Sequence, residues 1–219
     1  MFTFLSDFAY FNRPGVAAHV APMAQYFADA AAGKLPGVSF IEPGLHDGLS
    51  EHPSNFHPDN PALGEPTINV QVGAQFASKV INAVMQGPSW SDTVLFFAHD
   101  EGGGTFDHVP PLAVASPDGI KPLDLLPIDS PGDFTLTAGR VPNMVISPFT
   151  KKNFVSHTPM DYTAYLRFIE ARWSLPTLTA RDASMPDMTE FFDFTGKPWA
   201  TPPTPPAQNM NGACDFTKQ

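Results

Sequence analysis

Cysteine is almost absent from this sequence, and so are long apolar runs and a surplus of basic residues. The single cysteine, Cys214, excludes an internal disulfide. No apolar stretch approaches the roughly 20 residues that a membrane-spanning helix needs. The formal net charge of −10 argues against nucleic acid as the main partner, because binding to a phosphate backbone needs a basic surface. A small phosphorylated substrate is compatible with this charge, since a bound cation can reverse the local field.

Two further signals are missing. Residues 1–7 lack the basic and long apolar regions of a secretory signal peptide, so we expect a soluble chain that carries no recognisable address. No Gly-x-Ser-x-Gly nucleophile elbow occurs either. Hydrolysis of carboxylic esters through such a serine therefore has no motif in its favour, and we rank it last.

The composition is that of a globular protein rich in loops. Hydrophobic residues make up 42% of the chain and include 19 Phe, which predicts a packed core, whereas 25 Pro and 16 Gly predict many turns. A length of 219 residues suits one domain, residues 1–219. Its last part, residues 198–219, contains repeated prolines and is expected to be an extended tail or strap.

Apolar spacing and turn residues predict alternating helices and strands. The predicted helices cover residues 22–32, a segment capped by Asn69 and stopped at Gly87, and a segment that begins at Pro159 within a capping-box-like pair, Thr158 and Asp161. The predicted strands cover residues 38–41, 93–99 and 141–146, and the long loops cover 44–66 and 110–139. This alternation favours an α/β fold with a parallel sheet.

The most informative segment runs from His99 to His108, directly after an apolar strand. Open α/β sheets bind ligands at the carboxyl ends of their strands, and Asp, Glu and His are side chains that bind divalent metals. Asp100 and Glu101, followed closely by Asp107, therefore predict a metal-assisted active site. The alternative interpretation is a tight turn with solvated acids.

Individual residues of this segment allow several roles. His108 is suited to bind metal, to contact phosphate or to donate a proton, because a free imidazole titrates near neutrality. Asp107 is suited to orient His108 or to bind metal, and the alternative for the pair is a capped turn. His99 is equally compatible with a satisfied core histidine.

A second polar cluster lies in the loop with His46, His52 and His57. Their spacing matches no regular zinc-finger pattern, and a solvated loop is the alternative for each of them. Lys151 and Lys152 could attract an anion, although a solvated pair explains them as well.

The run Asp100-Glu101-Gly102-Gly103-Gly104-Thr105-Phe106-Asp107-His108-Val109 resembles the Asp-Glu-x-Gly-Gly-x-x-Asp-His-Val signature of the phosphoesterase family. That family contains bacterial non-haemolytic phospholipases C and related acid phosphatases. Further segments resemble the family in the same order, so the resemblance extends from about residue 22 to the end of the chain. They include Glu51-His52-Pro53, Arg140-Val141-Pro142, Leu166-Arg167-Phe168-Ile169-Glu170 and Thr179-Ala180-Arg181-Asp182.

The resemblance implies an alkaline-phosphatase-like α/β core and metal-dependent hydrolysis of phosphate esters. It implies that Asp100 and Glu101 are ligands of a divalent metal, that His52 and His108 lie near the phosphate and the leaving group, and that Asp107 supports them. In this family a metal-activated hydroxyl attacks phosphorus, and water hydrolyses the resulting phosphoenzyme. The expected substrate is a small phosphate ester or a phospholipid head group.

Two departures from the family pattern stand out. The family's early Glu-Asn metal motif and its nucleophile segment have no counterpart here, so we expect the carboxy-terminal portion of a longer protein or a shortened member. The family's Asp-His-Thr is Asp161-Tyr162-Thr163 in this chain. The rival hypothesis is a catalytically incomplete module that binds metal or anion, and exposed apolar surface would favour its assembly into a homo-oligomer.

Overall fold

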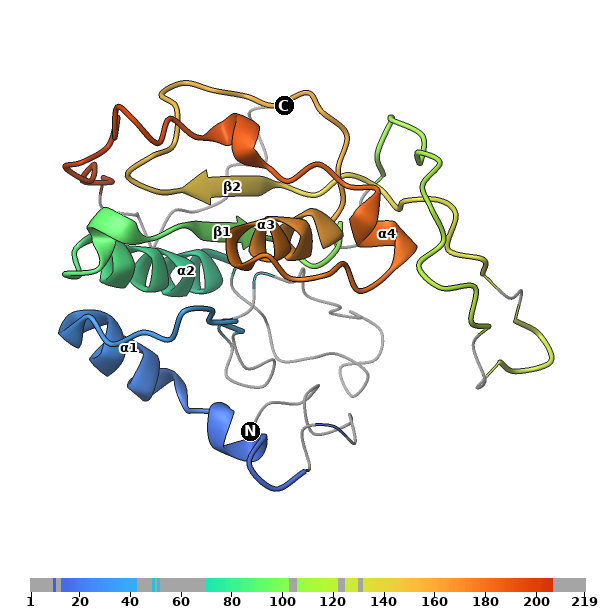
Figure 1. The fold of residues 1–219 in the computed structure, drawn as a ribbon, viewed down its shortest axis with the longest axis horizontal. Coiled ribbons are helices and arrows are strands. Elements are labelled where there is room, and N and C mark those ends of the chain that lie inside the picture. Colours follow the sequence, from blue (N-terminus) through green and yellow to red (C-terminus); the bar gives the residue numbers. More distant parts are fainter. Residues whose placement is uncertain are drawn as a thin grey trace, which may run out of the picture. The chain divides into compact units, whose positions relative to one another are not determined.

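A computed structural model describes residues 10, 13–42, 49, 51, 70–102, 106–121, 125–129 and 132–206. The chain divides into two compact units, unit 1 with Met1–Thr93 and Thr201–Gln219, and unit 2 with Val94–Ala200. The predicted mixture of helices and strands is confirmed (Figure 1), whereas a single domain over residues 1–219 stays a prediction.

Unit 1 is built around two helices, α1 (Met23–Ala32) and α2 (Val70–Met85), with the short 3-10 helices η2 (Ala17–His19) and η5 (Trp90–Asp92). The Tyr26 hydroxyl donates a hydrogen bond to the Val80 carbonyl at 2.8 Å and links the two helices. Burial raises the pKa of Tyr26 to about 12. The buried apolar side chains of this unit are those of Tyr26, Ala30, Val80, Val84, Met85 and Trp90.

Glycines determine where the two helices end and how closely they meet. Gly33 follows α1 with a φ of 66°, the left-handed conformation that favours glycine at a helix end. A side chain on Gly87 would place its Cβ 2.7 Å from the Ala30 carbonyl oxygen, so only glycine fits this approach. The predicted helix over 22–32 and the stop near Gly87 are confirmed, whereas the predicted Asn69 cap lies outside the described residues.

Unit 2 contains strands β1 (Leu95–Ala98) and β2 (Asn143–Ile146), helices α3 (Thr163–Trp173) and α4 (Ala180–Ala183), and the 3-10 helix η6 (Thr189–Phe191). Helix α3 lies beside β1 (Figure 1), and aromatic rings pack between the two elements. Phe96 stacks on Tyr165 with ring centres 4.9 Å apart, and its ring meets that of Phe168 edge-on at 5.2 Å. This packing confirms the strand predicted at 93–99, in shorter form.

The parallel sheet expected from the sequence is not what the two strands form. β1 and β2 run antiparallel, with Leu95 opposite Ile146 and Ala98 opposite Asn143. A parallel pair needs a crossover connection, usually a helix, and the described residues between β1 and β2 contain none. The connection instead leaves and returns at one end of the sheet, so an alkaline-phosphatase-like parallel core stays a prediction.

That connection folds back on itself as an arm, defined here as the described residues between 106 and 138. Ala113 and Leu136 form an isolated antiparallel bridge in it. Arg181, from α4, donates from Nη1 to the carbonyls of Ala115 at 2.9 Å and Phe134 at 2.6 Å. The arm is thus joined to α4, and the loop-rich character predicted for this segment is confirmed.

Two local predictions are wrong. No strand forms at residues 38–41, where Phe40 is 79% exposed and no partner strand is present among the described residues. Helix α3 begins at Thr163 rather than at Pro159, because the Thr158 hydroxyl binds Glu190 at 3.1 Å. The Asp161 Oδ1 accepts from the amide of Thr163, the first residue of α3, at 2.8 Å.

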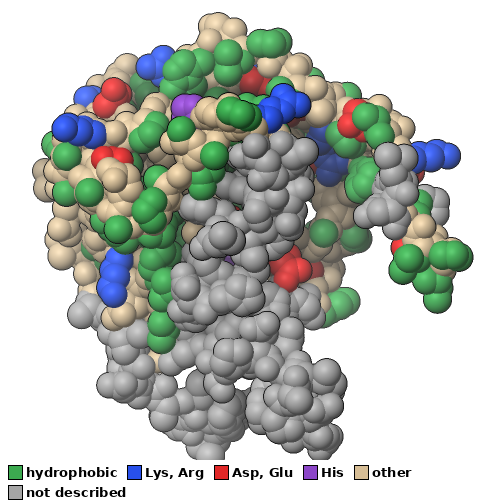
Figure 2. All heavy atoms as spheres, turned by 90° about the horizontal axis from the view of Figure 1, so that it is seen from below, with side chains coloured by type: hydrophobic (Ala, Val, Ile, Leu, Met, Phe, Trp, Pro, Cys, Tyr) green, Lys and Arg blue, Asp and Glu red, His purple; other side chains and the backbone are tan. Residues whose placement is uncertain are grey.

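Large apolar side chains also reach the surface. Figure 2 shows apolar side chains beside basic and acidic ones on one face. Such surface is what the predicted self-association would use, and the oligomeric state stays a prediction. The most exposed large apolar residues of the arm are Phe106, Ile120, Leu126, Ile128 and Leu136.

No helix in the described part of the chain combines the length and apolarity required to cross a membrane.

Candidate active site

The acidic pair Asp100 and Glu101 follows the end of β1 and begins two residues beyond Ala98. The His99 amide donates to the Pro142 carbonyl at 3.4 Å and extends the pairing by one step. Asp100 and Glu101 follow, and both are exposed. The Asp100 Oδ1 accepts from the Glu101 amide at 3.1 Å, a contact that an isolated turn also makes. Both carboxylates therefore stand at the edge of the sheet and are accessible to a ligand.

Tyr162 contacts this motif from the start of α3. Its hydroxyl donates a hydrogen bond to the carbonyl oxygen of His99. Burial, together with the negative charge of Asp100, raises the pKa of Tyr162. The residue that replaces the histidine of the family pattern is thus next to the acidic pair, a proximity that no local sequence signal indicates.

Asp107 is held by Arg140 in a two-bond ion pair. Arg140 donates from Nε to Oδ2 at 2.9 Å and from Nη2 to Oδ1 at 2.8 Å. Its backbone amide donates to Oδ2 at 2.8 Å, and the Val109 amide donates to Oδ1 at 3.0 Å. These hydrogen bonds, led by that from the Arg140 side chain, hold the pKa of Asp107 well below its usual range. Asp107 is therefore a stable carboxylate suited to orient Arg140 rather than to exchange protons.

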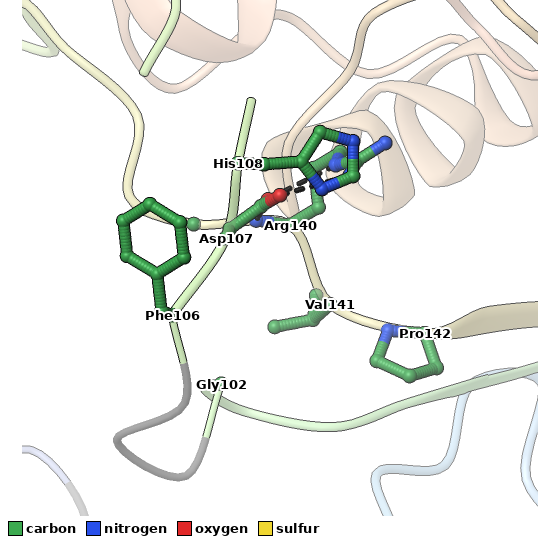
Figure 3. Close-up of a pocket in the computed structure, with 8 residues that line it drawn as sticks. Gly102, Phe106, Asp107, His108, Arg140, Val141 and Pro142 are labelled. Atoms are coloured by element: carbon green, nitrogen blue, oxygen red, sulfur yellow. Dashed lines mark hydrogen bonds and ion pairs between the residues drawn. The ribbon is translucent and has the colours of Figure 1, made fainter. Parts of the chain in front are cut away.

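A pocket of about 500 Å³ opens beside this pair. In Figure 3 the side chains of Asp107 and His108 extend toward Arg140, whereas Phe106 extends in another direction. The return of the chain before β2 brings this arginine to the end of β1. In the sequence, Arg140 belongs to a segment that resembles the family, and no local signal assigns it a role. The lining residues are Gly102, Phe106, Asp107, His108, Gly139, Arg140, Val141 and Pro142.

The site chemistry suits a hard cation only in part. Asp100 and Glu101 offer accessible carboxylate oxygens, the ligands that Mg²⁺ and Ca²⁺ prefer. Within the described residues, no group of three or more His, Cys, Asp and Glu side chains is placed to hold a metal. His52, and with it His46 and His57, lies outside those residues. The metal ligands and the role of His52 therefore stay predictions.

The remaining candidates have other partners. Lys151 donates to the Glu190 carbonyl at 2.8 Å, and Lys152 lies over the Trp199 ring at 4.8 Å. His99 is half-buried and meets the Phe97 ring edge-on at 5.5 Å. None of these three lines the pocket.

Sequence comparison relates this chain to known proteins. The model of the phosphoesterase family matches residues 5–176. Phospholipase C B of Mycobacterium tuberculosis is 34% identical over 196 residues, which cover 85% of this chain and 34% of that protein. Non-hemolytic phospholipase C of Burkholderia pseudomallei is 35% identical over 193 residues, covering 81% of this chain and 25% of that protein.

A plant protein shows the same relationship. Non-specific phospholipase C1 of Arabidopsis thaliana is 31% identical over 182 residues, which cover 78% of this chain and 32% of that protein. The chain therefore spans between a quarter and about a third of the length of these three curated relatives. Since the family model covers residues 5–176 and with them the acidic motif, the pocket and α3, the chain belongs to the phosphoesterase family.

Proposed function

We propose that this chain carries part of the active site of a metal-dependent phosphate-ester hydrolase. The observation that supports this most is that the family match includes the Asp100–Glu101 pair, whose carboxylates are exposed at the end of β1. The relatives are named phospholipases C, so the proposed substrate is a phosphate ester, with phospholipid head groups as the first class to test. An alkaline-phosphatase-like core is part of the same proposal.

We propose a separate role for each residue of the site. Asp100 and Glu101 would hold a divalent cation through their carboxylate oxygens. When bound, the cation would neutralise phosphate charge and stabilise the charge that develops on oxygen in the transition state. His108, exposed at the pocket, would donate a proton to the leaving alcohol. His52 would contact the phosphate, and Asp107 would support the site through Arg140.

The experiment compares chelator sensitivity with the effect of one carboxylate. Hydrolysis of p-nitrophenyl phosphate and p-nitrophenyl phosphocholine is measured with added Mg²⁺, Ca²⁺, Mn²⁺ or Zn²⁺ and with EDTA, for the wild-type chain and Asp100→Asn. We expect phosphate-ester hydrolysis that EDTA abolishes and that falls at least about a hundredfold in Asp100→Asn, since removing one electrostatic stabiliser costs this much. p-Nitrophenyl acetate should not be hydrolysed.

Asp118→Asn is the matched control. Asp118 lies on the arm and accepts one nearby backbone amide, that of Ile120 at 2.8 Å, much as Asp100 accepts that of Glu101. Hydrolysis that resists EDTA and is equal in the two variants would refute the proposal.

A second candidate function is a metal- or anion-binding module without turnover. The accessible carboxylates of Asp100 and Glu101 support cation binding, and within the described ranges no group of three or more metal-binding side chains is placed with them. The same experiment separates the two functions. Cation binding in calorimetry that is lost in Asp100→Asn, with no hydrolysis under any condition, would support the module and contradict the enzyme.

A further inference from the structure

Arg140 has hydrogen-bond donors left over after it has bound Asp107. A guanidinium carries five N–H groups, and the two side-chain bonds to Asp107 use one on Nε and one on Nη2. Both N–H groups of Nη1 and the second one of Nη2 have no protein partner among the described residues. The arginine side chain is 62% exposed, whereas that of Asp107 is 15% exposed. One edge of the guanidinium is thus fixed, and the opposite edge is open.

The open edge belongs to a residue that lines the pocket together with His108 (Figure 3). A planar guanidinium with two parallel N–H groups matches the geometry of two oxygens on a phosphoryl group. Asp107 fixes the plane of that guanidinium through two side-chain bonds and also accepts from the Arg140 backbone amide. Because the side chain is already ordered, little rotamer entropy remains to be lost when an anion binds.

We propose that Arg140 is a substrate-binding residue that grips the phosphoryl oxygens of the ester in this pocket, and that Asp107 is the positioning residue that orients it. The proposal deepens the proposed function, on which it rests, by assigning the anion contact to a residue other than the metal-binding pair. The aspartate cancels the net charge of the pair, so recognition comes from directed N–H donors rather than from a positive field. His108 also lines this pocket and would supply a further donor.

Inorganic phosphate is the probe that tests this assignment. Its dissociation constant is measured by calorimetry for the wild-type chain, Arg140→Gln, Arg140→Lys and Asp107→Asn, with and without the activating cation. We expect Arg140→Gln to bind phosphate roughly tenfold more weakly or worse, because charge-assisted hydrogen bonds are lost. Arg140→Lys should recover only part of the affinity, since an ammonium group lacks the planar fork. The phosphate affinity of Asp107→Asn should lie between those of the wild type and Arg140→Gln.

Arg172→Gln is the matched control. Arg172 is on α3, its guanidinium lies over the Trp173 ring at 5.4 Å, and it does not line the pocket. The Arg172→Gln variant should bind phosphate with the affinity of the wild type. Circular dichroism of every variant checks the fold, so a loss of binding with an unchanged spectrum reports on the contact itself. In steady-state assays, Arg140→Gln should raise the KM for p-nitrophenyl phosphate more than it lowers kcat, as expected for a contact made before the transition state.

The outcomes separate this inference from the proposed function. Metal-dependent hydrolysis with the same KM and the same phosphate affinity in Arg140→Gln would overturn the role of Arg140 and leave the enzyme intact. Phosphate binding that needs Arg140, without hydrolysis under any condition, would support the contact and contradict the enzyme. A wild-type chain that binds no phosphate at millimolar concentration, with or without cation, would overturn the inference.

Discussion

Unit 2 contains two aspartate–arginine pairs that use the same chemistry in different surroundings. Arg181 binds Asp161 through Nε at 2.5 Å, and the two side chains are only 14% and 16% exposed. Arg140 binds Asp107 at 2.8 Å, but its side chain is 62% exposed. The first pair is enclosed by the protein, whereas the second is open to the solvent on the arginine side.

The partners of the remaining N–H groups separate the two pairs further. Arg181 also donates to two arm carbonyls, those of Ala115 and Phe134, and Asp161 accepts from the amide of Thr163 at the start of α3. This pair therefore joins the arm, α3 and α4. Burial alone would raise the pKa of Asp161, but hydrogen bonds from Thr163 and Arg181 hold it below the usual value. An enclosed arginine stabilises the fold, whereas one with an open edge is free to bind a ligand.

The largest effect is expected for Arg181→Gln. Removing Arg181 leaves the enclosed Asp161 carboxylate without its cation and two carbonyl groups without this donor, and we expect the free energy of unfolding to fall by about 3 kcal/mol. Urea denaturation followed by circular dichroism measures this fall. Arg172→Gln, the matched surface control, should change it by less than about 0.5 kcal/mol. An equally small effect of Arg181→Gln would remove the distinction between the two pairs.

The buried carboxylate of Asp182 has no arginine partner in the part of the chain that the structure describes and can be compared with the two aspartate–arginine pairs. Asp182, on α4, is 1% exposed, and its neighbour Glu170, on α3, is 4% exposed. Burial would raise the pKa of Asp182, but hydrogen bonds from Thr179, Leu178 and Glu170 lower it to about 2. Burial, and then hydrogen bonding to Asp182, raises the pKa of Glu170, although Arg167 opposes this shift from 3.6 Å. The pKa values of these two neighbouring carboxyl groups are thus shifted in opposite directions.

The pH dependence of stability follows from these directions. Glu170 contributes to the free energy of unfolding fully below its pKa in the unfolded chain, about 4.3. This contribution is lost as the pH rises through the higher pKa that Glu170 has in the folded protein. The contribution of Asp182 to stability is present above its pKa in the unfolded chain and is lost as the pH falls toward its folded pKa of about 2. In Glu170→Gln, the fall in urea midpoint between about pH 4.3 and neutrality should be smaller than in the wild type, because an amide does not ionise. Parallel curves for the two proteins would contradict this.

Local signals in the sequence predicted the elements better than their partners. Gly33 ends α1 as expected, because the left-handed conformation of a glycine is a local property. The pattern Thr-x-x-Asp occurs at both Thr158 and Thr179, but only Thr179 and Asp182 form a capping box. Thr158 is instead bound by Glu190, a residue 32 positions away. No pattern of neighbouring residues indicates which of two equal motifs a distant carboxylate will capture.

In the candidate site, too, short-range patterns in the sequence indicate single residues but not their distant partners. The acidic pair was found because it follows an apolar strand directly, a short-range signal. The contacts of Tyr162 with His99 and of Arg140 with Asp107 join residues 63 and 33 positions apart. They depend on how α3 packs and on the antiparallel return of the chain to β2. The alternation of elements in the sequence predicts a parallel sheet, whose geometry does not bring the segment before β2 to the end of β1.

The smallest change in stability is expected for Arg140→Gln. Solvent competes for an exposed guanidinium, so an exposed ion pair contributes little to folding, and added salt screens it further. The urea midpoint should shift far less than in Arg181→Gln, and the shift should shrink as the salt concentration rises. Denaturation at low and high salt measures both effects. If Arg140→Gln were as destabilising as Arg181→Gln, the open pair would be part of the framework, and its spare donors would no longer distinguish it as a site for an anion.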